Sequence, residues 1–243
     1  MKGRNGVGIT LSKDLKVSLL GVNRKNDRIM SLNLELGATI VNVVCAYALQ
    51  TGCTAEEKDA FWEEMDQELR IIPARERVII GDLNGHLGIS REGIERVHGS
   101  WGVGERNDGG EKVIDFAVAF DLAMINTFFE KRINRLIIYS SSGRESQIDL
   151  QLCKRDHLTE VRNCKVINGE SVAAQHRSGW VDGGLEGGEQ AVHEGIDFGH
   201  QVLHGQNIDI GDSSAYRFGL AHRCVEAKKT SKASSVWQSN LWH

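Results

Sequence analysis

The stretch of residues 77–88, Arg-Val-Ile-Ile-Gly-Asp-Leu-Asn-Gly-His-Leu-Gly, constrains the fold of this chain more than any other. A short apolar run ends in Gly81 and is followed by Asp82 and Asn84. Residues two apart on an extended backbone project to the same side, so a carboxylate and an amide would leave the end of a buried strand together. Asp82 can hold a water or a divalent cation, and Asn84 can donate to an oxyanion. A strand end followed by an Asx-type turn is the alternative that this pattern leaves open.

The composition is that of a globular protein without a membrane segment. The 243 residues are 40% hydrophobic and 26% charged, and no apolar run approaches the roughly 20 residues that cross a bilayer. The first residues lack the apolar core of a secretory signal, and the five cysteines form no Cys-x-x-Cys pair. We therefore expect an intracellular protein with reduced thiols, and the pattern leaves nuclear and cytoplasmic locations open.

The net charge of −4 does not indicate a general nucleic-acid-binding surface. Neutralising phosphates normally requires clustered Lys and Arg. Any contact with DNA or another nucleic acid would therefore depend on local clusters such as Lys131-Arg132 with Arg135, which are as easily part of a solvated surface.

The first half of the chain predicts several strands and one helix. Residues 29–36 alternate between apolar and polar side chains, with Met30 and three leucines on one face, which is typical of a half-buried strand. Residues 38–48 predict a more deeply buried strand, paired with the first across a tight turn after Gly37. Thr54-Ala55-Glu56-Glu57 is a capping-box pattern that predicts a helix over residues 54–72. Before these elements we expect an opening segment at 6–9, a turn at 12–14 and a strand at 17–22.

The second half has a weaker pattern. Residues 88–109 are rich in glycine and polar residues and predict a long loop over the strand ends. The further predicted elements are a helix over about 110–121, a strand over 122–129, a hairpin of 136–140 with 147–153, and a strand over 161–167. We expect the buried face of that helix to carry Val113, Ile114, Ala117, Val118 and Phe120.

The amino-acid composition of the sequence changes near Arg177. From Ser178 onward the chain is glycine-rich and has few large apolar residues in register. We therefore predict a main domain over residues 1–177 and a glycine-rich tail of low order over 178–243.

The segment Gly81-Asp82-Leu83-Asn84 resembles the Gly-Asp-Phe-Asn signature of the endonuclease/exonuclease/phosphatase superfamily. The resemblance extends from Gly6-Val7-Gly8-Ile9 through the Asn107-x-Gly-Gly segment and Asn126-Thr127-Phe128-Phe129 to Ile148-Asp149, and so covers most of residues 3–177. The chain looks most like endonuclease domains of LINE-type retrotransposons and the craniofacial development protein 2-like sequences that are similar to them.

The resemblance implies a fold, a reaction and a set of site residues. The fold is an α/β two-sheet β-sandwich flanked by helices, the DNase I-like four-layer sandwich. Tyr47, Asp82, Asn84, Asp149 and His176 match the superfamily's site in order. Asp82 would position or activate a water, Asn84 and Tyr47 would donate to the phosphate, and His176 would act as acid, base or electrophile while Asp149 fixes its tautomer. The alternatives are that Tyr47 anchors a strand end, Asp149 is a polar hairpin residue and His176 lies on the surface.

The sequence departs from the superfamily pattern at the metal site. The superfamily begins with a strand ending in Asn and a strand bearing a Gln-Glu pair, whose glutamate is the principal metal ligand. This sequence begins after both, and its only Gln-Glu pair, Gln67-Glu68, lies in the predicted helix. The superfamily's Ser-Asp-His reads Ala174-Gln175-His176 here, and Ser178-Gly179-Trp180 replaces the apolar strand that usually follows. We therefore expect an N-terminally truncated, incomplete sandwich in which Asp82 binds Mg²⁺ or Mn²⁺ weakly.

The leading hypothesis is a metal-dependent phosphodiesterase or endonuclease-type domain of retroelement ancestry, weakened or inactive because the glutamate ligand is missing. One alternative is a non-catalytic remnant or binding module that keeps the fold. A further alternative is a phosphomonoesterase of the same superfamily. The resemblance implies DNA or another nucleic acid as partner, and the sequence leaves the oligomeric state open.

Overall fold

The structure is a computed structural model of the whole chain. It describes residues 7–11, 13–49, 52–81, 83–141, 144–148, 150–173, 176–183, 194–198 and 218–222. In this part of the chain no helix is long and apolar enough to cross a membrane.

A six-stranded mixed sheet forms the centre of the molecule, in the order β2-β3-β4-β5-β9-β6. Its strands are β2 (Leu19–Arg24), β3 (Ile29–Leu36), β4 (Thr39–Ala46), β5 (Arg77–Gly81), β6 (Leu122–Met124) and β9 (Gln151–Lys154). β4 and β5 are parallel and the other neighbours are antiparallel. β5 lies between β4 and β9. The first part of the stretch 77–88 therefore forms an interior strand of the sheet.

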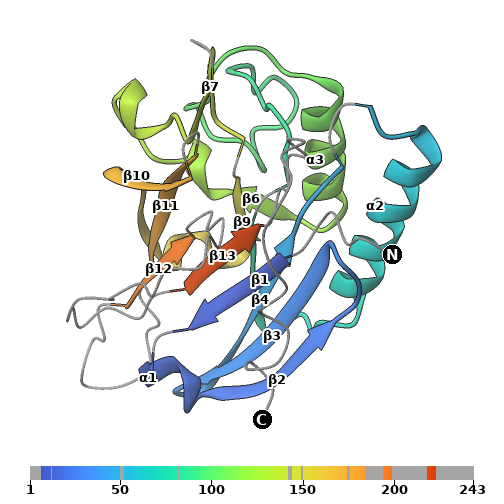
Figure 1. Ribbon diagram of the computed structural model, residues 1–243, viewed down its shortest axis with the longest axis vertical. Coiled ribbons are helices and arrows are strands. Elements are labelled where there is room, and N and C mark those ends of the chain that lie inside the picture. Colours follow the sequence, from blue (N-terminus) through green and yellow to red (C-terminus); the bar gives the residue numbers. More distant parts are fainter. Residues whose placement is uncertain are drawn as a thin grey trace, which may run out of the picture.

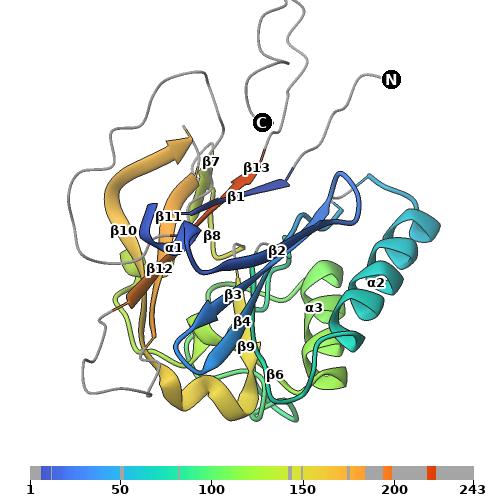
Figure 2. The same cartoon turned by 90° about the horizontal axis from the view of Figure 1, so that it is seen from below.

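A second sheet packs against one face of the first (Figures 1 and 2). It runs in the order β10-β11-β7-β8, with β12 also on β11, and a separate pair joins β1 to β13. The elements are β1 (Val7–Leu11), β7 (Tyr139–Ser141), β8 (Arg144–Ser146), β10 (Val161–Ala173), β11 (His176–Gly183), β12 (Glu194–Phe198) and β13 (Phe218–His222). β11 runs across the domain boundary predicted at Arg177, and the division into 1–177 and 178–243 stays a prediction.

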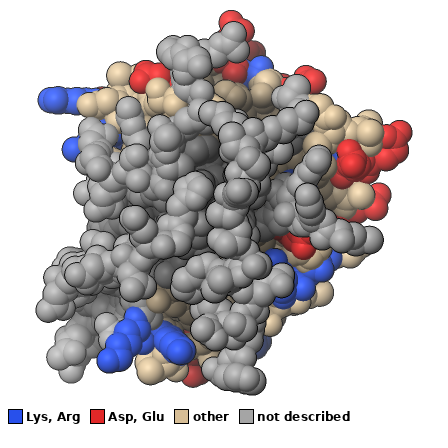
Figure 3. Space-filling model, in the orientation of Figure 1, with Lys and Arg blue, Asp and Glu red and all other residues tan. Residues whose placement is uncertain are grey.

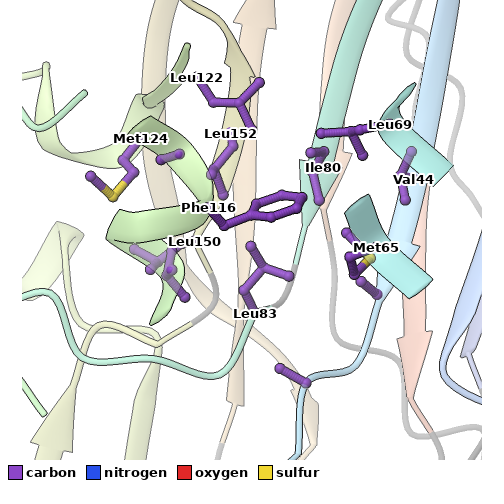
Figure 4. Close-up of a cluster of buried hydrophobic side chains, with 14 of the residues drawn as sticks. Val44, Met65, Leu69, Ile80, Leu83, Phe116, Leu122, Met124, Leu150 and Leu152 are labelled. Atoms are coloured by element: carbon purple, nitrogen blue, oxygen red, sulfur yellow. The ribbon is translucent and has the colours of Figure 1, made fainter. Parts of the chain in front are cut away.

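Two helices, α2 (Ala55–Arg70) and α3 (Asp108–Ala119), cover the opposite face of the six-stranded sheet (Figure 2). Side chains from both helices and from β4, β5, β6 and β9 form one apolar core. Figure 4 shows Phe116 of α3 among Ile80, Leu83 and Leu152. The loop after β5 is part of this core, because Leu83 is 1% exposed.

A second core fills the space between the two sheets. It combines side chains of β3 and β4 with Ala123 of β6, Cys153 of β9 and Ile125 just after β6, and with Cys164 and Val181 of the second sheet. Along β4 the residues alternate, so Val43, Cys45 and Tyr47 face the second sheet and Val44 and Ala46 face the helices. The predicted α/β class, with two packed sheets and helices outside, is confirmed.

Several element predictions are confirmed in detail. β3 spans the predicted residues 29–36, with Leu32 and Leu34 in the core between the sheets. Thr54 forms the predicted capping box: its hydroxyl accepts from the Glu57 N–H, and the Glu57 carboxylate accepts from the Thr54 N–H. The turn between β3 and β4 places Gly37 at a φ of 62°, a left-handed conformation that glycine adopts without strain.

Other element predictions are wrong. Residues 13–16 form the short helix α1 rather than a turn. The predicted second helix is present as α3, but it begins two residues earlier than predicted, at Asp108 after the N-cap Asn107. Phe116 is buried and Val118 is 55% exposed; the two lie about 200° apart around a helix, so the larger apolar ring takes the core position. The predicted strand 122–129 ends at Met124, where a 3₁₀ turn, Ile125–Thr127, begins. The predicted hairpin of 136–140 with 147–153 is also wrong: β7 pairs with β8, residues 144–146, and residues 151–154 form β9 of the six-stranded sheet.

Candidate functional site

Three strands of the six-stranded sheet meet at one edge. Because β4 and β5 are parallel and Cys45 is paired with Gly81, the residues after both strands leave the sheet side by side. β9 runs antiparallel to β5 and starts at Gln151, paired with Gly81. The ends of β4 and β5 and the start of β9 therefore lie together. In the sequence, Tyr47 and Asp82 directly follow the first two strands, and Asp149 precedes Gln151 by two positions.

Asp82 and Asp149 themselves lie outside the described residues, and their predicted roles stay predictions. Their neighbours in the chain are well placed: Gly81 and Leu83 are buried, and Leu150 is completely buried in the helix-side core.

Asn84 lies half-buried at this edge, on a backbone held in an unusual shape. Its φ is 48°, in the left-handed region that Asn tolerates better than most residues. The next residue, Gly85, packs directly on the start of α3, because a Cβ there would lie 2.8 Å from the Gly109 carbonyl oxygen. The absence of a side chain at Gly85 therefore allows the loop to pack on the N-terminus of α3.

The N-cap of α3 fixes this loop. The Asn107 side-chain oxygen accepts from the N–H of Gly110 at 2.8 Å and from the N–H of His86 at 3.1 Å. The Asn107 N–H in turn donates to the His86 carbonyl oxygen at 3.2 Å. One side chain thus caps the helix and holds the segment that carries Asn84. Burial lowers the pKa of the His86 imidazole below its ordinary value, which favours the neutral ring.

The second sheet contributes a row of three residues across β11, β7 and β8. Tyr139 is paired with His176 on one side and with Ser146 on the other. Adjacent strands are about 4.8 Å apart, so the backbones of His176 and Ser146 are about 10 Å apart. The side chain of His176 is outside the described part of the structure, so its predicted role stays a prediction.

A short connection joins this row to the first sheet. Only residues 147–150 separate Ser146 of β8 from Gln151 of β9, and Asp149 belongs to this connection in the sequence. The topology therefore places His176 on a strand two positions from the one that leads into residue 149.

Tyr47 is 8% exposed and belongs to the core between the sheets. Its N–H donates to the Arg28 carbonyl oxygen, the Arg28 guanidinium donates to the Tyr47 carbonyl oxygen, and that guanidinium lies 5.2 Å from the centre of the ring. These contacts fit the alternative of a strand-end anchor, and a role toward a phosphate stays a prediction.

A buried polar network at the same edge was not predicted. The Asn126 side-chain oxygen accepts from the Gln151 N–H at 2.7 Å, and the Asn126 amide donates to the Gln151 side-chain oxygen at 3.1 Å. The Cys164 thiol donates to the same oxygen at 3.3 Å. Gln151 stands between the apolar residues Leu150 and Leu152, and a polar residue flanked in this way in a strand is the signal that could have identified it.

The loop between β5 and α3 extends this edge outward. Thr127 accepts at its hydroxyl from the Gly99 N–H and at its carbonyl from the Trp101 N–H. Gly102 packs so closely on the Gly88 carbonyl that a Cβ would lie 1.9 Å from its oxygen. The loop therefore carries Trp101 next to the segment that follows Asn84.

The described residues at this edge do not by themselves form a metal site. Among the side chains that the structure describes, no group of three or more His, Cys, Asp or Glu could hold a metal ion. The oxygens near the strand ends belong to the amides of Asn84, Asn126 and Gln151, whereas Mg²⁺ prefers charged oxygen ligands. The binding of a cation by Asp82 stays a prediction, because Asp82 lies outside the described residues. Glu68, from the only Gln-Glu pair, accepts from Ser31 and Asn23 on β3 and β2 instead.

Comparisons with known proteins identify similar sequences for most of the chain. No protein-family model matches the chain. Craniofacial development protein 2 of Tragulus javanicus is 31% identical over 177 residues, 72% of this chain, and that of Bos taurus is 30% identical over the same length. The match spans 30% of each relative's own length. The predicted resemblance to craniofacial development protein 2-like sequences is confirmed.

Among solved structures, the endonuclease domain of TRAS1, a telomere-specific non-LTR retrotransposon, is similar with a TM-score of 0.47. The identity is 16%, and the match covers 72% of this chain and 78% of that domain.

Proposed function

We propose that this chain is a phosphodiesterase or endonuclease-type domain of retroelement ancestry that acts on a nucleic acid with the help of a divalent cation. The observation that carries the proposal is the meeting of three strand ends at one edge of the central sheet. The positions of Tyr47, Asp82 and Asp149 follow or precede the paired residues Cys45, Gly81 and Gln151. The resemblance of the sequence to the endonuclease/exonuclease/phosphatase superfamily supports the same reading.

The residues at this edge suit the chemistry of a phosphodiester. Hydrolysis requires an oriented water, neutral donors where negative charge develops, and a group that moves a proton. In the proposal Asp82 orients the water, Asn84 donates its amide N–H to a phosphate oxygen, and His176 moves the proton while Asp149 holds its ring. Mg²⁺ or Mn²⁺, held by Asp82, would neutralise the phosphate oxygens.

The rim of the site favours a nucleic acid over a small phosphate ester. Ile89 is 62% exposed and Trp101 is 37% exposed, and each is next in the chain to a member of the close contact between Gly88 and Gly102. Exposed aromatic rings next to a phosphate site are suited to stacking on unpaired bases, which small esters lack. In contrast, the outer face of α2 carries exposed Glu56, Glu57, Asp59 and Glu63, and Figure 3 shows acidic side chains gathered on that side. A polyanion would avoid that face.

The direct test is nicking of supercoiled plasmid DNA with and without Mg²⁺. Activity should require the cation and should fall by at least about a hundredfold in Asp82→Ala and His176→Ala. Asp66→Ala is a matched control, because Asp66 is an exposed aspartate that pairs with Arg70 on α2. Nicking that is unaffected by both substitutions at the site would remove those residues from the mechanism. Phosphate release from a monoester, measured in parallel, identifies a phosphomonoesterase.

A non-catalytic binding module is the second candidate, and the position of Glu68 favours it. That glutamate is 3% exposed and is bound to Ser31 and Asn23, so it does not supply the ligand that the superfamily draws from its Gln-Glu pair. Calorimetric titration with Mg²⁺ or Mn²⁺ separates the two candidates. Micromolar binding that Asp82→Ala abolishes supports the enzyme, and the absence of any heat of binding supports the module.

A further inference from the structure

The central sheet has an irregularity at the candidate site. β6 pairs with β9 only as far as Met124 with Leu152, and the chain then turns into the 3₁₀ segment Ile125–Thr127. A regular β6 would have continued the backbone ladder to Gln151. Instead the Asn126 side-chain oxygen accepts the Gln151 N–H at 2.7 Å, so a side chain continues the ladder where the strand stops.

Gln151 is the point at which the two sheets and the candidate site are joined. Its backbone is paired with Gly81, the residue before Asp82, and it follows Asp149 by two positions. Its side-chain oxygen accepts from Asn126, in the 3₁₀ segment that follows β6, and from Cys164 of β10 in the second sheet. Asn126 and Gln151 are 6% and 1% exposed, so these bonds are shielded from water.

The Cys164 thiol, the third member of the network, remains a hydrogen-bond donor at physiological pH. Burial raises the pKa of the Cys164 thiol to about 12, although the positive charge of Lys131 opposes the rise. The thiol therefore keeps its proton at any physiological pH and continues to donate to Gln151.

We propose that Asn126 and Gln151 are positioning residues that hold the strand ends bearing Asp82 and Asp149 in the geometry required for hydrolysis. The inference rests on the proposed function and adds to it two residues that do not touch the substrate. Asn126 acts through Gln151: without its side chain, the start of β9 keeps its pairing with β5 but loses its support on the β6 side. The residues next to Gln151 and Gly81 would then shift, and displacements near 1 Å can lower a rate by about a hundredfold.

A matched control exists in the same sheet. Asn42 of β4 is 2% exposed and also makes buried side-chain bonds, donating to the Glu76 carboxylate at 3.0 Å and to the Arg77 carbonyl oxygen at 3.1 Å. It is paired with Val78 at the far end of β5 from Gly81. Asn126→Leu and Asn42→Leu therefore remove the same kind of group from opposite ends of the sheet.

The experiment compares both variants in the plasmid-nicking assay at a temperature at which each is fully folded by circular dichroism. Both should lose a similar amount of thermal stability. Only Asn126→Leu should lower kcat by about tenfold or more with KM little changed, because the substrate contacts remain while the reacting geometry is lost. Equal kcat in the two variants, or wild-type kcat in Asn126→Leu, would overturn the proposal.

Two more conservative variants at Cys164 test the same network in case Asn126→Leu does not fold. Cys164→Val removes one donor to Gln151 and should lower kcat by a few-fold, while Cys164→Ser keeps a donor and should restore it. Failure of Ser to recover activity lost in Val would contradict a role through hydrogen bonding.

A readout that does not require catalysis separates this inference from the proposed function. Amide hydrogen exchange should accelerate at Gln151 and its neighbours in Asn126→Leu, and near Val78 in Asn42→Leu. Accelerated exchange at Gln151 in a protein that never nicks DNA would overturn the proposed function and leave the positioning contact standing. Unchanged exchange at Gln151 would overturn the positioning contact itself.

Discussion

Replacing Gly110 with alanine tests the contact that holds the candidate site against α3. In an ordinary helix the change would stabilise by about 1 kcal/mol. Here an added Cβ would lie 1.8 Å from the His86 carbonyl oxygen, so the loop or the helix start must retreat by roughly 1.5 Å to reach normal contact. The movement would also stretch the bonds from Asn107 to the N–H groups of His86 and Gly110.

The expected net effect is a destabilisation of about 2 kcal/mol, because overpacking costs about 1–3 kcal/mol and the strained bonds outweigh the gain in helix propensity. For a domain of this size that corresponds to a melting temperature lower by roughly 6 °C. Urea and thermal unfolding followed by circular dichroism measure it. Under the proposed function, nicking activity should fall more than stability, because Asn84 lies on the displaced loop.

The neighbouring glycine provides the control. A Cβ at Gly109 would meet its closest neighbours, the Asn107 side chain and the Asn84 carbonyl oxygen, at 3.4 Å, an ordinary contact. Gly109→Ala should therefore leave stability unchanged or raise it by up to about 1 kcal/mol. If Gly110→Ala proved as stable as Gly109→Ala, the close docking of the loop on α3 would be refuted.

Three further predictions concern separate parts of the molecule. Gln147 is 3% exposed and its amide nitrogen has no hydrogen-bond partner among the described residues, so Gln147→Met should raise stability by about 1 kcal/mol in urea unfolding, and a loss would show that the amide is bonded. Burial raises the pKa of Glu160, but hydrogen bonds from Arg77 and His157 lower it by more than burial raises it, so the net pKa lies below the ordinary 4.5. The stability that Glu160 contributes is therefore complete above pH 4.5 and is lost as the pH falls through its folded pKa; the stability difference between wild type and Arg77→Met should shrink there, and a constant difference would contradict the pairing. Trp101→Ala should raise KM for DNA several-fold and leave hydrolysis of a small diester unchanged, and equal effects on both substrates would argue against base stacking.

The elements that the sequence predicted well are those whose signal is local. The capping box at Thr54 needs only four adjacent residues, and the faces of β3 follow from strict alternation. β6 was predicted too long because residues 122–129 are apolar almost throughout. The strand ends at Met124, and beyond it the Gln151 N–H donates to the Asn126 side chain, a contact between residues 25 positions apart. No local pattern can reveal such a contact.

The candidate site also contains residues that the sequence predicted and residues that it did not. The sequence predicted a strand leading to Gly81 and a functional Asn84, and the structure places Asn84 at an edge shared by three strands. It did not predict Asn126 and Gln151, because their significance appears only when β9 is inserted between β5 and β6. For Tyr47 the two kinds of observation differ. Its place in the order of site residues suggests a catalytic role, whereas its contacts with Arg28 are those of a residue that anchors the end of a strand.

The position of β9 also bears on how the molecule is made. β9 lies between β5 and β6 in space but follows both in the chain. A polypeptide emerging from the ribosome would therefore carry two finished strands with an open slot between them until residue 154 had left the exit tunnel. Open strand edges attract other chains. A nascent chain of this protein would thus be most prone to aggregation shortly before β9, the last strand of the central sheet, is synthesised. A chaperone that binds the nascent chain would be most useful at that stage.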